Sequence, residues 1–116
     1  MDAQLIRNNA MTVVLNIAKQ FSRSPAGRYR TDGPFSGEAF REDLLLPALS
    51  QSEALEVQLD GVLGFGSSFL EEAFGGLVRE AGLKADALHA KLRISSKLKT
   101  YEQRVWRYVD DARPKS

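Results

Sequence analysis

The chain of 116 residues has the length of one domain and, with 43% hydrophobic residues, can bury a core of its own. It contains no cysteine, which excludes disulfide bonds, thiolate metal sites and a cysteine nucleophile. Its first residues include an acid, Asp2, and only a short apolar run, Met11–Leu15, which differs from a secretory signal or a membrane span. We therefore expect a cytoplasmic, single-domain protein with no membrane partner.

The net charge is +1, but the charges are unevenly distributed. Residues 1–34 carry five bases and two acids (+3), residues 35–82 two bases and nine acids (−7), and residues 83–116 nine bases and four acids (+5). Such blocks are usual on solvated helix faces. The near-zero total argues neither for nor against nucleic acid, which we do not expect as a partner.

The first half of the chain is predicted to contain two strands and a helix. Thr12–Ile17 is β-branched and apolar, which favours a buried strand. After a turn, Arg28–Arg30 is predicted to return as a short edge strand. Ser36 is predicted to be the N-cap of a helix that runs to about Leu45, where Pro47 ends or kinks it.

The second half is predicted to contain two strands and two helices. Leu55–Asp60 alternates apolar and polar side chains as a strand does, and Lys91–Ser95 is predicted as a short strand. Apolar side chains at helical spacing predict helices over residues 69–81 and 98–112.

A glycine pair interrupts the helix predicted over residues 69–81. Gly75 and Gly76 each cost that helix about 1 kcal/mol relative to alanine. We expect close packing of the helix backbone against a sheet to compensate for this cost.

The order of these elements predicts a small α/β domain. Helices between the later strands predict that those strands are parallel and joined by right-handed crossovers. We expect a mixed sheet of about four strands with helices covering one face, in which Leu55–Asp60 is central and Thr12–Ile17 is its neighbour. The core covers about residues 12–110, and residues 113–116 are predicted to form a loose tail.

A glycine-rich segment follows the predicted central strand. Gly61, Gly64 and Gly66 precede Ser67 and Ser68. Two of these glycines have the spacing of a phosphate-binding loop, but Ser67 stands where that loop needs a lysine. The dinucleotide-binding fingerprint also lacks its third glycine, so triphosphate or dinucleotide binding is not expected.

No catalytic group of residues is recognisable in the sequence. The only histidine, His89, lies in a polar stretch without an evident partner, and we expect it on the surface. Glu71 and Glu72 are adjacent in a predicted helix and should not face each other, which argues against a carboxylate pair. The spacing of metal ligands is absent. We expect a protein without enzymatic activity, cofactor or metal.

Two interpretations of Ser68 are compatible. With Glu71 three residues later, Ser68 has the spacing of a capping box, in which its hydroxyl accepts a bond from the Glu71 amide. The same hydroxyl would lie at the carboxyl edge of the sheet, where ligands and partners approach α/β domains. Phe65 and Phe69 would provide an apolar anchor for a partner if exposed, with core packing as the alternative, especially for Phe69.

Arg28 and Arg30 form the second candidate site. A strand would place both side chains on one face, where they could bind a phosphate or an acidic partner. The alternative is that they are solvated edge-strand charges that prevent aggregation.

Three segments carry a resemblance to a known family. "GRYRTDGPFSGEAFRE", "LLLPAL" and "LDGVLGFGSSFLEEAFGGLVRE" closely resemble the bacterial STAS-like domains of unknown function, over about residues 12–110. The strand, short loop, paired serines and helix are also similar to the STAS domain of anti-sigma-factor antagonists. In those antagonists the loop commonly reads Asp-Ser-Ser-Gly, and a partner kinase of the GHKL ATPase type phosphorylates the second serine. The unphosphorylated domain binds the anti-sigma factor.

By position, Gly66-Ser67-Ser68-Phe69 corresponds to that motif, with Gly66 and Phe69 in place of its aspartate and glycine. The resemblance implies that Ser68 is the phosphorylatable residue. A phosphate there would add about two negative charges at a helix N-terminus, favoured by the helix dipole and opposed by Glu71 and Glu72.

The resemblance thus implies a non-catalytic signalling module that binds a protein partner, either a GHKL-type ATPase kinase or an anti-sigma-like factor, under control of serine phosphorylation. The residues expected to bind the partner are Gly64, Phe65, Gly66, Ser67, Ser68, Phe69, Glu71 and Glu72. The alternative is a STAS-like domain that binds a nucleotide or small anion with the same loop and Arg28 or Arg30. The oligomeric state is left open.

Overall fold

Three parallel strands form the sheet of this computed structural model, which describes residues 12–115. They are β1 (Thr12–Asn16), β2 (Ala54–Gln58) and β3 (Leu92–Ser95), and they lie side by side in that order. The central position of β2 and its pairing with β1 confirm the prediction from the sequence.

The predicted fourth strand over Arg28–Arg30 is wrong. Arg28 and Tyr29 form a bend, and the chain continues as the 3-10 turn η1 (Arg30–Asp32). Asp32 Oδ2 accepts hydrogen bonds from the amides of Arg28 and Tyr29 at 3.0 and 2.8 Å. These local bonds satisfy the backbone without a neighbouring strand. The sheet is therefore three-stranded and parallel in the described residues, rather than mixed.

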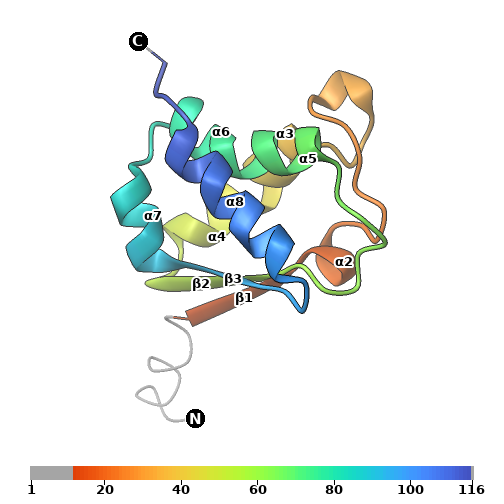
Figure 1. The fold of residues 1–116 in the computed structure, drawn as a ribbon, viewed down its shortest axis with the longest axis horizontal. Helices are drawn as coiled ribbons and strands as arrows, with labels where there is room; N and C mark the ends of the chain where they lie inside the picture. The colour runs from red at the N-terminus through yellow and green to blue at the C-terminus, as the bar shows by residue number, and fades with distance from the viewer. Residues whose placement is uncertain (1–11, 116) are drawn as a thin grey trace.

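Within residues 12–115, the sheet has one buried and one open face, because the helices lie over one side only (Figure 1). On the covered face, the register partners Leu15, Val57 and Ile94 are all at most 4% exposed. On the other face, Val14 of β1 is 47% exposed, and Arg93 of β3 is exposed in the same row across the sheet. This alternation is the two-residue period of a sheet buried on one side.

Five helices accompany the sheet in the described part of the chain, residues 12–115. The first is α2 (Ile17–Gln20), and the second comprises α3 (Gly37–Phe40), the π-helical turn η2 (Arg41–Leu45) and α4 (Leu46–Ser50). The third comprises α5 (Ser67–Leu70), the π-helical turn η3 (Glu71–Gly75) and α6 (Gly76–Arg79), and the last two are α7 (Ala85–Lys91) and α8 (Lys99–Asp111). The sequence analysis missed α2 and α7, which are short and bury one residue each, Ile17 and Leu88.

Pro47 neither ends the helix nor limits it to Leu45. It lies in the first turn of α4, directly after η2, and the helix continues to Ser50. Because η2 and α4 form one continuous helix, Pro47 removes a backbone donor from its interior, and the helical hydrogen bonds depart from the regular α pattern in the π-helical turn directly before it.

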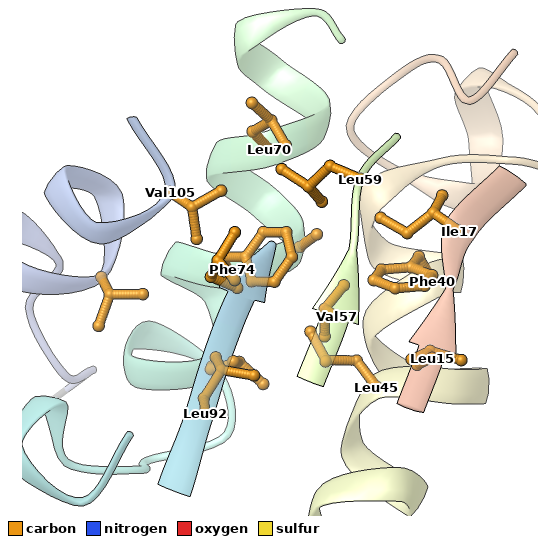
Figure 2. Packing of buried hydrophobic residues seen from close by; sticks show 14 of the residues in the cluster. Leu15, Ile17, Phe40, Leu45, Val57, Leu59, Leu70, Phe74, Leu92 and Val105 are labelled. Atoms are coloured by element: carbon orange, nitrogen blue, oxygen red, sulfur yellow. The ribbon is translucent and has the colours of Figure 1, made fainter. Parts of the chain in front are cut away.

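The core lies between the covered face of the sheet and the helices. We call the two helices that contain a π-helical turn, α3–η2–α4 and α5–η3–α6, the two long helices. Figure 2 shows Leu15 and Val57 from the strands, Phe40 and Phe74 from the two long helices, and Val105 from α8. Phe40, Phe74 and Val105 are fully buried.

The glycine pair has a different cause from the one expected. A Cβ on Gly75 would lie 2.8 Å from Glu71 Oε2 and 3.2 Å from the carbonyl oxygen of Tyr108. Gly75 thus lets α8 approach the backbone of η3, so the predicted packing of this glycine against the sheet is wrong.

The helix beginning at Ser36 provides a test of local stability. The Ala39 amide donates to the buried Ser36 Oγ at 3.1 Å, which confirms the predicted N-cap. The N-cap of α5 is instead Gly66, and no side chain caps that helix. We expect Ser36→Ala to lower the free energy of unfolding by about 1 kcal/mol, and Ser68→Ala to change it by less than about 0.5 kcal/mol. Urea titrations of both variants measure this, and equal losses would contradict the assignment.

Candidate functional site

The loop between β2 and α5, residues 59–66, leaves the carboxyl end of the central strand and is held on both sides. Asp60 Oδ1 accepts a hydrogen bond from the Lys97 amide at 2.9 Å. The Leu63 amide donates to the carbonyl oxygen of Arg23, also at 2.9 Å. The side chain of Leu63 is nevertheless 76% exposed. The loop therefore presents an apolar side chain from a backbone fixed by two neighbouring segments.

Neither phenylalanine of the predicted site is available to a partner. Phe65 is 8% exposed and Phe69 is fully buried. Their rings stack with centroids 5.8 Å apart, and the rings of Phe65 and Tyr101 pack edge to face with centroids 5.2 Å apart. Of the two alternatives for these side chains, the structure therefore favours core packing over an exposed anchor, because both rings complete the core under the loop. Leu63, which the sequence analysis did not select, is the exposed apolar residue of this loop.

The paired serines lie at the start of α5, but Ser68 does not cap it. Gly66 is the N-cap, Ser67 is the first helical residue and is exposed, and Ser68 is the second and is half-buried. The predicted capping box between Ser68 and Glu71 is absent because the helix starts earlier than the pattern indicated. The hydroxyls of Ser67 and Ser68 are thus free of a capping bond.

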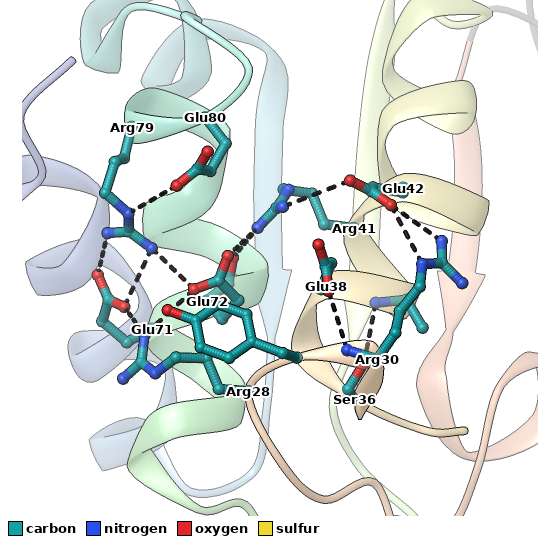
Figure 3. A network of polar contacts seen from close by, with 12 residues as sticks. Arg28, Arg30, Ser36, Glu38, Arg41, Glu42, Glu71, Glu72, Arg79 and Glu80 are labelled. Atoms are coloured by element: carbon teal, nitrogen blue, oxygen red, sulfur yellow. Dashed lines mark hydrogen bonds and ion pairs between the residues drawn. The ribbon is translucent and has the colours of Figure 1, made fainter. Parts of the chain in front are cut away.

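A buried ion pair lies behind the serines and joins the two long helices. The side chains of Arg41 and Glu72 are each 3% exposed. Arg41 Nη1 donates to Glu72 Oε2 at 2.7 Å and to the Glu72 carbonyl oxygen at 2.6 Å (Figure 3). A Cβ on Gly76 would lie 2.0 Å from Arg41 Nη1. The second glycine of the pair therefore provides the space in which the guanidinium lies.

Two more arginines extend this pair outward. Arg79 donates to Glu71 Oε2 at 2.6 Å and to Glu72 Oε1 at 3.0 Å. Arg28 donates to Glu72 Oε1 at 3.2 Å and also contacts Glu71. Contrary to the prediction that Glu71 and Glu72 would not face each other, both carboxylates share the same two arginines at the start of the π-helical turn η3.

The charges in this network alter the titration of its members. Partial burial acts to raise the pKa of Glu71, but hydrogen bonds from Arg79 and Arg28 outweigh it and hold that pKa below its ordinary value. The hydrogen bond to Glu71 raises the pKa of both Arg28 and Arg79. With Arg41, three arginines face two glutamates, so the two acids that begin η3 present no net negative charge here.

Arg28 and Arg30, predicted to act together, lie in separate ion-pair groups. Arg28 belongs to the network of Glu71 and Glu72, whereas Arg30 Nη2 lies 3.0 Å from Glu42 Oε1 and 2.7 Å from Asp43 Oδ1. The hydrogen bond from Arg30 lowers the pKa of Asp43. Because Arg28 lies in a bend and Arg30 begins the 3-10 turn η1, their side chains do not share one face as they would in a strand.

Sequence reasoning missed the role of Arg41 and Arg79. Arg41 lies four residues after Gly37 and four before Leu45, both buried. An arginine at helical spacing from buried residues indicates a buried cation that needs an acid. The second signal was the glycine pair Gly75–Gly76, a few residues after Glu72, because glycines within a helix can leave space for a large side chain of a neighbouring helix.

His89 is exposed, as predicted, but it has partners. Its Nε2 lies 2.7 Å from Asp110 Oδ1, and its ring stacks on Trp106 with centroids 4.1 Å apart. These contacts join α7 to α8.

Within residues 12–115, no group of three or more acidic or histidine side chains could hold a metal ion. In the same range, every helix is too short or too polar to cross a bilayer.

The buried pair predicts a large difference between two arginine variants. Arg41→Ala should lower the free energy of unfolding by about 3–5 kcal/mol, because it leaves the Glu72 carboxylate buried without its main partner. Arg30→Ala removes ion pairs between side chains that are about half exposed and screened by solvent, and should cost far less than Arg41→Ala. The double variant Arg41→Met with Glu72→Met should recover much of the loss. A double variant no more stable than Arg41→Ala would contradict an electrostatic cause.

The lowered pKa of Glu71 predicts how stability depends on pH. The folded chain binds fewer protons at Glu71 than the unfolded chain does in acid. The stabilisation is therefore complete above the ordinary glutamate pKa of about 4.3 and is lost as the pH falls below it. Glu71→Gln should make the decline of the unfolding free energy below about pH 5 shallower than in the wild type. Urea titrations across this range measure the slope, and an unchanged slope would rule out the contribution.

Comparison with known proteins gives one finding about the family. The model of the STAS-like domain of unknown function (DUF4325) matches residues 36–99, which include both long helices, β2, the loop of residues 59–66 and β3. No curated protein and no solved structure matches the chain. On the family match, which covers more than half of its length, this chain belongs to the STAS-like domains of unknown function.

Proposed function

We propose that this chain is a non-catalytic regulatory module that binds a protein partner through residues Gly64–Glu72, which we call the serine corner, together with the adjacent Leu63. The observation that carries the proposal is the 76% exposure of Leu63 on a loop whose backbone is fixed at both sides. An apolar side chain on a rigid support loses little conformational freedom on docking, which favours binding. The loop also leaves the carboxyl end of the central strand, where α/β domains commonly receive partners.

The serines of the corner are suited to control that binding. Ser67 is exposed and Ser68 half-buried, and neither caps the helix. A phosphate on either would add about two negative charges next to Leu63, at the positive end of the helix dipole. Glu71 and Glu72 oppose such a charge less than their sequence positions indicated, because Arg28, Arg41 and Arg79 neutralise them. The partner classes implied by the family resemblance are a GHKL-type ATPase kinase and an anti-sigma-like factor.

The alternative of nucleotide or anion binding receives no comparable support. The arginines assigned to it, Arg28 and Arg30, are each held by two carboxylates. An anion would have to displace those carboxylates to be bound.

Quantitative capture of the partner tests the proposal. The tagged chain would be used to recover partners from a lysate of its source organism, beside Leu63→Ser, Ser68→Asp and Ser68→Ala. We expect Ser68→Ala to bind like the wild type, and Leu63→Ser and Ser68→Asp to recover at least about fivefold less of the same partner. Val14→Ser is the matched control, since Val14 is also exposed but lies on the open face of the sheet.

Thermal melts of the same variants show that each is folded. Equal recovery by Ser68→Asp and the wild type would contradict control by phosphorylation. Equal recovery by Leu63→Ser, or an equal loss in Val14→Ser, would contradict binding through the corner.

A further inference from the structure

Three segments follow the carboxyl ends of the strands. They are residues 17–24 after β1, which include α2, residues 59–66 after β2 and residues 96–99 after β3. Hydrogen bonds of Leu63 with Arg23 and of Asp60 with Lys97 join the second segment to the other two. In Figure 1 they lie at the end of the sheet next to α2. Together they carry four bases and one acid, a net charge of +3; the bases are Lys19, Arg23, Lys97 and Lys99, and the acid is Asp60. The surface is therefore basic, although its central loop comes from the acidic third of the sequence.

These four bases differ from the arginines of the buried network. All four side chains are exposed. Within residues 12–115, none of them has a carboxylate within the 4.0 Å of an ion pair, whereas Arg28, Arg30, Arg41 and Arg79 all do. The one acid among the loops, Asp60, uses an oxygen to accept the Lys97 amide. The positive charge of this surface is thus free to meet an external acid.

Exposed leucines lie among these bases. Leu98 is 58% exposed, next to Lys97 and Lys99 in the chain, and Leu63 is 76% exposed three residues after Asp60. The hydrogen bond between Asp60 and the Lys97 amide ties the two leucine-bearing loops together. Two exposed leucines with a basic surround match a protein segment that carries both acids and apolar side chains. A nucleic acid would use the charges but leave the leucines without an apolar partner.

We propose that this basic edge, residues 17–24, 59–66 and 96–99, binds an acidic segment of the partner whose apolar side chains cover Leu63 and Leu98. The inference rests on the proposed function and names the chemistry of the partner. A phosphate on Ser67 or Ser68 would reduce the positive charge that attracts such a segment, which agrees with the direction of control that the family resemblance already implies.

The probe for this inference is a synthetic peptide of alternating glutamate and leucine residues, titrated into the full ¹⁵N-labelled chain. Three comparison probes are a lysine–leucine peptide, a glutamate–serine peptide and a single-stranded oligodeoxynucleotide. We expect the glutamate–leucine peptide to bind more tightly than all three and to shift the amide signals of Leu63, Lys97 and Leu98. Its affinity should fall as NaCl rises from about 0.05 to about 0.5 M.

A charge-reversed variant with a matched control sharpens the test. Lys97→Glu combined with Lys99→Glu should weaken peptide binding by about tenfold or more. Arg93→Glu combined with Arg107→Glu reverses two exposed bases outside the basic edge and should retain wild-type affinity. The inference is overturned if the glutamate–leucine peptide does not bind or shifts signals elsewhere. It is also overturned if the lysine–leucine or glutamate–serine peptide or the oligonucleotide binds as tightly, or if both double variants behave alike.

Failure here is distinguishable from failure of the proposed function. If Leu63→Ser loses the natural partner while Lys97→Glu with Lys99→Glu keeps it, the corner binds a partner that is not acidic. If Leu63→Ser keeps the partner as well, the proposed function itself is wrong.

Discussion

The buried pair of Arg41 and Glu72 is the interaction on which the arrangement of this domain depends. Each side chain is 3% exposed, so neither charge retains its hydration, and each is costly to bury without the other. The pair joins the two long helices at their π-helical turns. Gly76 leaves room for the guanidinium, and Arg28 and Arg79 complete the coordination of the carboxylate. A pair of this kind selects one relative position of the two helices, because only that position satisfies both charges.

That position determines what the serine corner can present to a partner. The two acidic residues after the serines are both paired with arginines, and the Glu72 side chain is also buried, so neither presents an uncompensated negative charge. Phe65 and Phe69 fill the space beneath the loop and support it from inside. What remains is the exposed Leu63, the exposed Ser67 and half-buried Ser68, and the bases of neighbouring segments. The division is between the arginines that hold the helices and the bases at the strand ends, three lysines and Arg23, that have no carboxylate partner within residues 12–115.

The sequence was informative where one local cause determines the structure. Alternation of apolar side chains located β2, and the serine before an amphipathic run located the cap at Ser36. It was misleading where a longer-range contact decides. Arg28 was predicted in a strand, but it lies in a bend where its side chain forms ion pairs with Glu71 and Glu72, over forty residues away in the sequence. Ser68 has the spacing of a capping box, but Glu71 is drawn to Arg28 and Arg79 instead. The net charge of each third of the sequence did not predict the charge of the surface, because the fold brings segments from all three thirds together at one edge of the sheet.

The exchange of backbone amides in the complex with the natural partner tests the central claim most directly. The claim is that the loops at the carboxyl ends of the strands bind the partner, whereas the arginine network is structural. Hydrogen exchange of the free chain and of the complex should then differ by strong protection of residues 59–66 and 96–99, with residues 28–32 unchanged. Protection centred on the turn of Arg28 and Arg30, or on the open face of the sheet around Val14, with no change at Leu63 or Leu98, would contradict it.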